Sequence, residues 1–122
     1  MRDLGADYII NYREQTVKQY VESLTNNQGF DIVYDTIGGK NLDNSFLAAR
    51  NNGQVINILA FIPHDLTPAF VRGVTIHLEN MSLPLLTGVG RERQGEILEE
   101  VAKHVDAGKL KPLINEQRFT FA

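Results

Sequence analysis

The stretch Gly29–Gly39, with the sequence GFDIVYDTIGG, decides the fold class of this chain. Its first half is an apolar, β-branched run that is typical of a buried strand, and the run stops on the acid Asp35. The turn of small residues that follows leads into a helix that we expect to begin near Asn41. In open α/β sheets, ligands bind where parallel strands end in such turns. The stretch therefore predicts a parallel sheet with a ligand site at its carboxyl edge.

A second stretch, Gly53–Phe61 (GQVINILAF), repeats this pattern further along the chain. It predicts another buried strand, over residues 54–59, that ends in a loop beside the first. Two parallel strands that end side by side indicate a nucleotide-binding crevice between their loops.

Helix and strand patterns alternate over the first half of the chain. Tyr8–Asn11 predicts a short buried strand, and a capping box of Thr16 and Gln19 predicts the start of a helix. The expected apolar face of this helix is formed by Val17, Tyr20, Val21 and Leu24. The helix that starts near Asn41 is expected to bury Leu42, Phe46, Leu47 and Ala49 and to stop at residues 51–53. Alternation with short loops indicates a parallel α/β sheet.

The second half contains one alternating segment and one long helix. Residues 62–73 predict an irregular segment with one short helical turn near residues 67–71. Val74–Asn80 alternates apolar and polar residues, which is typical of a strand with one open face. A loop is expected over residues 82–90 and a helix over residues 91–107, with Gly108 as its left-handed stop. Its expected inward residues are Ile97, Leu98, Val101, Ala102 and Val105, and residues 118–121 predict the start of a last strand.

Composition and charge exclude several classes of function. The 122 residues carry a net charge of −3, so no basic field exists to attract nucleic acid. No apolar run approaches the ~20 residues that span a bilayer, and no signal peptide is visible. There is no cysteine, and the three histidines, His64, His77 and His104, lack the spacing of metal ligands. We therefore expect a cytoplasmic protein with no metal, no nucleic-acid partner and no membrane contact.

Four stretches, at residues 4–12, 30–39, 53–58 and 105–112, together resemble the medium-chain dehydrogenase/reductase family. They are most similar to its quinone-oxidoreductase-like and zinc-binding dehydrogenase members, and they occur in the family's order and spacing. The resemblance implies that residues 1–122 are a partial NAD(P)-binding Rossmann domain. This would be a parallel sheet with flanking helices that lacks the first two strands of the family fold. No G-x-G-x-x-G phosphate loop occurs in this sequence, so the resemblance implies that this loop would precede Met1.

The truncation raises a question of strand pairing. In the family's strand order, the absent strands would lie between the Tyr8–Asn11 strand and the strand over residues 30–36. An unpaired strand would leave backbone groups unsatisfied. We therefore expect residues 8–11 to pair directly with residues 30–36 in a rearranged sheet, or to exchange between chains.

The resemblance also implies the residues that surround the cofactor. Tyr12 would lie near the adenosine 2′-phosphate of NADPH, or it would simply pack against a strand end. The turn after Asp35 would pass the adenine and ribose, although Asp35 could instead serve the next helix N-terminus. The loop after the second strand would lie beside the nicotinamide, or it would plug the strand end. The expected cofactor-binding residues are Tyr12, Asp35, Thr36, Gly38, Gly39, Leu59, Ala60 and Phe61, and no residue is assigned to catalysis.

Two functions follow as hypotheses. In the first, the chain is the cofactor-domain part of an NADP(H)-dependent oxidoreductase that acts on a small carbonyl, enone or quinone substrate and is inactive alone. NAD remains possible, because the residues that decide between the two cofactors would lie before Met1. In the second, the chain is a non-enzymatic module for dimerisation or partner binding.

In either case Val74–Asn80 resembles the edge strand through which such enzymes form homodimers. It could instead be a simple edge strand protected by His77 and Glu79.

Overall fold

The structure is a computed structural model that describes residues 1–117, and its contacts divide the chain into two compact units. Residues 7–81 form one unit, and residues 1–6 together with the segment from Ser82 onward form the other. The predicted strand over residues 118–121 lies outside the described residues. None of the helices in the described part is long and apolar enough to cross a bilayer.

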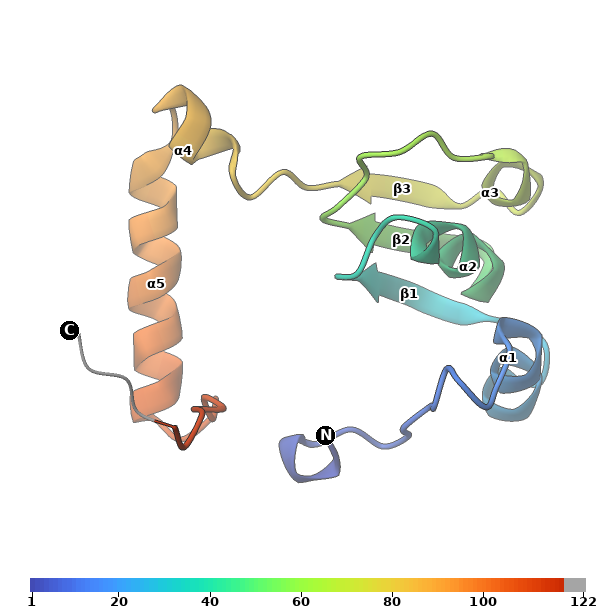
Figure 1. Cartoon of the computed structure of the whole chain (residues 1–122), viewed down its shortest axis with the longest axis horizontal. Helices are drawn as coiled ribbons and strands as arrows, with labels where there is room; N and C mark the ends of the chain where they lie inside the picture. The colour runs from blue at the N-terminus through green and yellow to red at the C-terminus, as the bar shows by residue number, and fades with distance from the viewer. Residues whose placement is uncertain (118–122) are drawn as a thin grey trace. The chain divides into compact units, whose positions relative to one another are not determined.

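The unit of residues 7–81 contains a three-stranded parallel sheet with helices between the strands (Figure 1). The strand order is β1-β2-β3, which confirms the predicted α/β class and the partial Rossmann-like sheet. The elements are α1 (Val17–Thr25), β1 (Phe30–Asp35), α2 (Asn41–Ala48), β2 (Ala49–Asn57), α3 (Thr67–Val71) and β3 (Thr75–Leu78).

The core of this unit lies between the sheet and α2. Val33, Val55 and Ile76 are neighbours across the three strands and point to the same face. They meet a cluster of buried residues from α2, β2 and α3, which consists of Leu42, Phe46, Ala49, Val55 and Ala69. On the opposite face Ile32 and Tyr34 are each 60% exposed, so within residues 7–81 only one side of the sheet is covered.

Local sequence signals placed the start of α1 and two core residues of α2 correctly. The Thr16 side chain accepts a hydrogen bond from the backbone of Gln19, and the Gln19 side chain accepts one from the backbone of Thr16, as the capping box requires. Leu42 and Phe46 are buried as expected, whereas Leu47 is 41% exposed and was wrongly assigned to the core.

The predicted strand at Tyr8–Asn11 is wrong. These residues form no strand, Tyr8 is 70% exposed, and β1 has no neighbour on its outer side within the described residues. The expected pairing with residues 30–36 is therefore absent from the single chain. Backbone bonds from Glu14 and Gln15 to the carbonyl of Asn11 turn the chain at once into the approach to α1. Within the described residues no strand lies beside residues 8–11 to satisfy their backbone groups.

The boundary between α2 and β2 also differs from the prediction. We expected a break at residues 51–53 before a strand over residues 54–59, but β2 begins at Ala49 and ends at Asn57. Ala49 is already extended, and the pairing with β1 shifts register between Phe30 and Ile32. Asn52, with a positive φ of 55°, lies within this irregular part of β2. Helix and strand therefore join without a loop.

The second unit contains a short 3-10 turn, η1 (Arg2–Leu4), and two helices, α4 (Leu83–Thr87) and α5 (Arg91–Asp106). Helix α4 lies in the segment that was predicted as a loop, with Pro84 in its first turn. The long helix is confirmed, and Gly108 has the expected positive φ of 68°. Its predicted inward face is not buried, because α4 is the main element that packs against it among the described residues of this unit. Ile97 is 48% exposed and Leu98 is 69% exposed.

Candidate functional site

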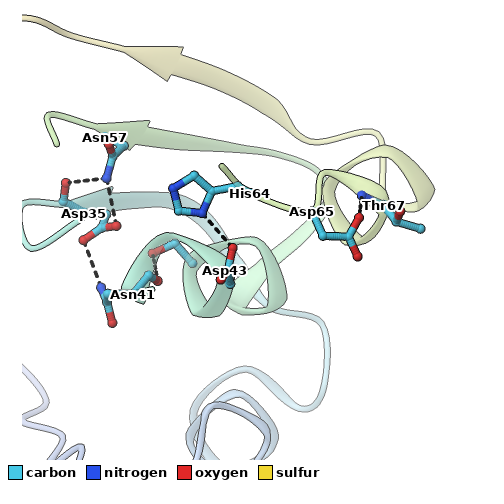
Figure 2. A network of polar contacts seen from close by, with 8 residues as sticks. Asp35, Asn41, Asp43, Asn57, His64, Asp65 and Thr67 are labelled. Carbon is cyan, nitrogen blue, oxygen red and sulfur yellow. Dashed lines mark hydrogen bonds and ion pairs between the residues drawn. The ribbon is translucent and has the colours of Figure 1, made fainter. Parts of the chain in front are cut away.

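The carboxyl ends of β1 and β2 are joined by a network centred on the Asp35 carboxylate (Figure 2). Asp35 is the last residue of β1 and is only 3% exposed. Its Oδ1 accepts hydrogen bonds from the backbone of Ile37 and Gly38, both at 3.0 Å, and from the Asn41 side chain at 2.9 Å. Its Oδ2 accepts from Asn57 Nδ2 at 2.9 Å. One carboxylate thus organises the turn after β1 and ties it to the end of β2.

The two strand-end loops also interlock through Leu59. Asn57 Oδ1 accepts a hydrogen bond from the Leu59 backbone at 2.9 Å, and the Leu59 carbonyl accepts one from Gly39 at 3.3 Å. Gly38 has a φ of +67°, and a side chain there would overlap the carbonyl and Cβ of Leu59. Glycine is therefore required at this position both by its dihedral angle and by the close approach of the second loop.

The environment of Asp35 favours its ionised form. Burial by itself would raise the pKa of the Asp35 carboxyl, but the hydrogen bonds from Gly38, Asn41, Ile37 and Asn57 outweigh it and hold the pKa below its ordinary value. A carboxylate with both oxygens occupied and a lowered pKa is poorly suited to transfer protons near neutral pH. Its geometry suits it to hold two loops together.

Four of the eight predicted site residues lie in this network, namely Asp35, Gly38, Gly39 and Leu59. Thr36, Ala60 and Phe61 are in the same two loops but are exposed, and Phe61 is 83% exposed. They have no contact with Asp35 among the hydrogen bonds of the described residues.

Tyr12 lies apart from the strand ends but close to the first turn of α2. It lines a cavity of about 360 Å³ together with Arg13, Asn41 and Asn44. The Arg13 guanidinium carbon is 5.9 Å from the centre of the Tyr12 ring. Because Asn41 also binds Asp35, this cavity adjoins the network at the end of β1.

Sequence reasoning missed two asparagines that complete the site. Asn41 was expected only to cap α2, but Lys40 occupies the cap position and the Asn41 side chain turns to Asp35. Asn57 is 1% exposed and bridges both loops. The signal for Asn57 was present, since it is a polar residue inside the apolar run Val55–Ile58.

A second polar pair, His64 and Asp43, was also missed. His64 Nδ1 lies 2.8 Å from Asp43 Oδ1, and the His64 side chain is 7% exposed. Figure 2 shows the imidazole above the first turns of α2, with Nδ1 directed at Asp43. The other ring nitrogen is buried and has no hydrogen-bond partner in the described part of the chain. The pair ties the segment after β2 to α2.

Comparison with known proteins agrees with this geometry. The model of a protein family described as zinc-binding dehydrogenase matches residues 4–122. The chain belongs to this family. The resemblance to medium-chain dehydrogenases/reductases is thereby confirmed. A solved alcohol dehydrogenase superfamily protein from Novosphingobium aromaticivorans is 36% identical, with a TM-score of 0.88 over 95% of this chain and 34% of its own.

Two curated relatives carry names that include a nicotinamide cofactor. The NADP-dependent oxidoreductase RED1 of Cochliobolus heterostrophus is 23% identical to this chain over 93% of the chain's length. The mitochondrial NAD(P)H oxidoreductase RTN4IP1 of Danio rerio is 25% identical over 100% of it. The chain spans 34% of each relative's length.

The name of the family raises the question of a zinc site. Within residues 1–117, no three His, Cys, Asp or Glu side chains gather closely enough to hold a metal ion. The pair of His64 and Asp43 supplies only two such groups. The described part of this family member therefore does not fit a zinc centre, and no chemistry is assigned to a metal here.

Proposed function

We propose that this chain is the cofactor-domain part of an NADP(H)-dependent oxidoreductase that acts on carbonyl, enone or quinone substrates. The observation that carries the proposal is the joined pair of strand-end loops, in which Asp35 and Asn57 hold the turn at Gly38 against Leu59. Parallel α/β sheets bind nucleotides at this edge. The cofactor, when bound, would supply the hydride, and this chain would bind and orient it.

The predicted residues fall into a buried group and an exposed group, for which we propose different roles. Asp35 and Gly38 would shape the loops from within, because both are buried. The exposed Thr36, Ala60 and Phe61 would meet the ribose and nicotinamide. Tyr12 and Arg13 line one cavity together with the acid Glu14, and the cation of Arg13 supports a preference for the additional phosphate of NADP over NAD.

The isolated chain is expected to bind NADPH only weakly. It has no G-x-G-x-x-G loop to place a pyrophosphate on a helix N-terminus. Calorimetry should therefore detect no tight binding. Amide resonances in a ¹⁵N-labelled sample should nevertheless shift at millimolar NADPH, and the shifts should be confined to residues 12–13, 36–39 and 59–61.

The matched control is Arg13→Gln compared with Lys18→Gln, a cation five residues away on α1. Arg13→Gln should remove the difference between NADPH and NADH in the resonance titration, and Lys18→Gln should leave it. Tight calorimetric binding by the isolated chain would contradict the expected inactivity. Shifts that miss the two strand-end loops would contradict the proposed site.

The proposed oxidoreductase would also form a homodimer through β3. This strand is at the edge of the sheet, and its outer side has no partner among the described residues. The Glu79 backbone donates to Asn57 on β2, so by alternation the Leu78 backbone N–H points away from β2. An unpaired edge of this kind can pair with the same strand of a second chain.

Leu78→Pro should therefore abolish the dimer without unfolding the chain. Proline removes the outward N–H and is tolerated on edge strands. The control Leu78→Ala keeps the N–H and should remain dimeric, since Leu78 is already 63% exposed. Sedimentation equilibrium distinguishes these outcomes. If the unsubstituted chain is a monomer, or if the Leu78→Pro variant is a dimer, pairing through β3 is refuted. A dimer without any NADPH-dependent shifts would favour the non-enzymatic module.

A further inference from the structure

We infer that a cavity at the amino-terminal end of the sheet binds a small organic anion with an apolar body. The cavity has a volume of about 790 Å³, within the range of ligand pockets. It is open to solvent on one side and is lined by α1, the turn before β1, the end of α2, the start of β2 and the residue after α3. The strands begin here, so the cavity lies at the opposite end of the sheet from Asp35. It is therefore separate from the proposed cofactor site.

The apolar part of the cavity comes from surfaces that the fold leaves unsealed. Helix α1 has an apolar face but no buried residue, and its Val17 and Val21 are only half-buried. Both residues line the cavity together with the 41% exposed Leu47, whereas Ala49, which also lines it, is already fully buried. An apolar body placed between α1 and the start of β2 would remove this surface from water.

The polar part of the cavity is cationic. Lys18, Arg50 and Arg72 line it, and none of the described residues that line it is acidic. Arg72 is held in place because its Nη1 donates to the carbonyls of Leu47 at 2.6 Å and Ala49 at 3.2 Å. Arg50 pairs with the exposed Asp31 on β1, and Lys18 has no ion-pair partner within residues 1–117. Of these three cations, Arg50 alone has an acidic partner among the described residues.

The combination of these two surfaces selects the ligand class. A carboxylate accepts charge-assisted hydrogen bonds from arginine and lysine. An alkyl or aryl group would cover the valines and Leu47, which inorganic phosphate or a polyphosphate cannot do. The cavity therefore fits an aliphatic or aromatic carboxylate better than a bare inorganic anion.

Octanoate is a suitable probe, with octanamide as its neutral counterpart. Titration of the ¹⁵N-labelled chain with octanoate, below its micelle-forming range, should give saturable shifts of amides around residues 17–21, 27–29, 47–51 and 72. The double variant Lys18→Gln/Arg50→Gln should weaken binding about tenfold, since hydrogen bonds to charged groups contribute most strongly. The double variant Arg93→Gln/Lys103→Gln, on the exposed surface of α5, is the matched control and should not weaken it.

Three results would overturn the inference. The first is the absence of saturable shifts at the cavity, and the second is equal affinity for octanamide. The third is a set of shifts centred on the exposed sheet face at Ile32 and Tyr34. Arg72 is left unchanged because its bonds to Leu47 and Ala49 also support the fold. Octanoate should leave the shifts that NADPH causes at residues 36–39 unaffected, so failure at one site does not imply failure at the other.

Discussion

Gly38→Ala is expected to lower the free energy of unfolding by about 3–5 kcal/mol, close to the largest effects of single substitutions. Gly38 has a φ of +67°, which costs an L-residue ~1–2 kcal/mol. The added methyl group would also overlap the carbonyl and Cβ of Leu59. Because that carbonyl belongs to backbone held by Asn57 and Gly39, it cannot move away cheaply. Urea denaturation followed by circular dichroism measures the change.

Gly39→Ala is the matched control for this prediction. Gly39 also has a positive φ, of 53°, but an added methyl group there would meet no atom within 4 Å. It should therefore cost only the ~1–2 kcal/mol of the dihedral angle. Equal effects of the two substitutions would show that the approach of Leu59 contributes nothing. A Gly38→Ala variant as stable as the parent would contradict the interlocked loops themselves.

Asp35→Asn is expected to cost about 2–4 kcal/mol, because the loss affects charge-assisted hydrogen bonds to a buried group. Asn offers one oxygen where Asp35 offers two, and its amide group would face another donor. Asn57 cannot relieve this by turning its own amide, since its Oδ1 accepts the Leu59 backbone. Both strand-end loops should therefore loosen, which hydrogen exchange at Gly38 and Leu59 would detect.

Asp31→Asn is the matched control, since it makes the same chemical change on the same strand. The Asp31 side chain is 81% exposed and, among the described residues, pairs with Arg50 alone, so its removal should cost less than ~1 kcal/mol. If the two substitutions cost the same, the network around Asp35 is not the source of stability.

Acid should remove the difference between the parent chain and Asp35→Asn. The folded pKa of Asp35 lies below its ordinary value of 3.8, so its contribution is present above pH 3.8 and is lost as the pH falls through the folded pKa. Urea midpoints measured from pH 7 downward should therefore be well separated at neutral pH and should converge only below pH 3.8. Convergence already at pH 5 to 6 would contradict the lowered pKa.

Local signals predicted much of the fold because they depend on neighbours in the chain. The capping box of Thr16 and Gln19 and the stop at Gly108 both formed as expected. The strand-turn-helix pattern at Gly29–Gly39 placed β1 and the start of α2 to within about one residue. The same pattern also identified the carboxyl edge where Asp35, Gly38 and Leu59 meet.

The errors arose where a residue's state depends on a distant partner. Tyr8–Asn11 has the composition of a strand, but a strand needs a neighbour to satisfy its backbone, and none adjoins it in residues 1–117. Leu47 and Leu98 have helical spacing suited to burial, yet each is exposed because no element among the described residues of its own unit covers it. Periodicity states which face is apolar but not whether another element lies against it.

The residues of Gly29–Gly39 determined the fold class and the position of the strand end, because these depend on local propensity. The family became evident only when this stretch was taken with residues 4–12, 53–58 and 105–112, because it depends on the order and spacing of all four along the chain. Only the tertiary structure decided what Asp35 does. Its four donors come from positions 37, 38, 41 and 57, and the last of these reaches it through the pairing of β1 with β2. The cavity between α1 and the start of β2 was equally invisible in the sequence. Its lining residues are spread from Val17 to Arg72, and only packing brings their charges and apolar surfaces together.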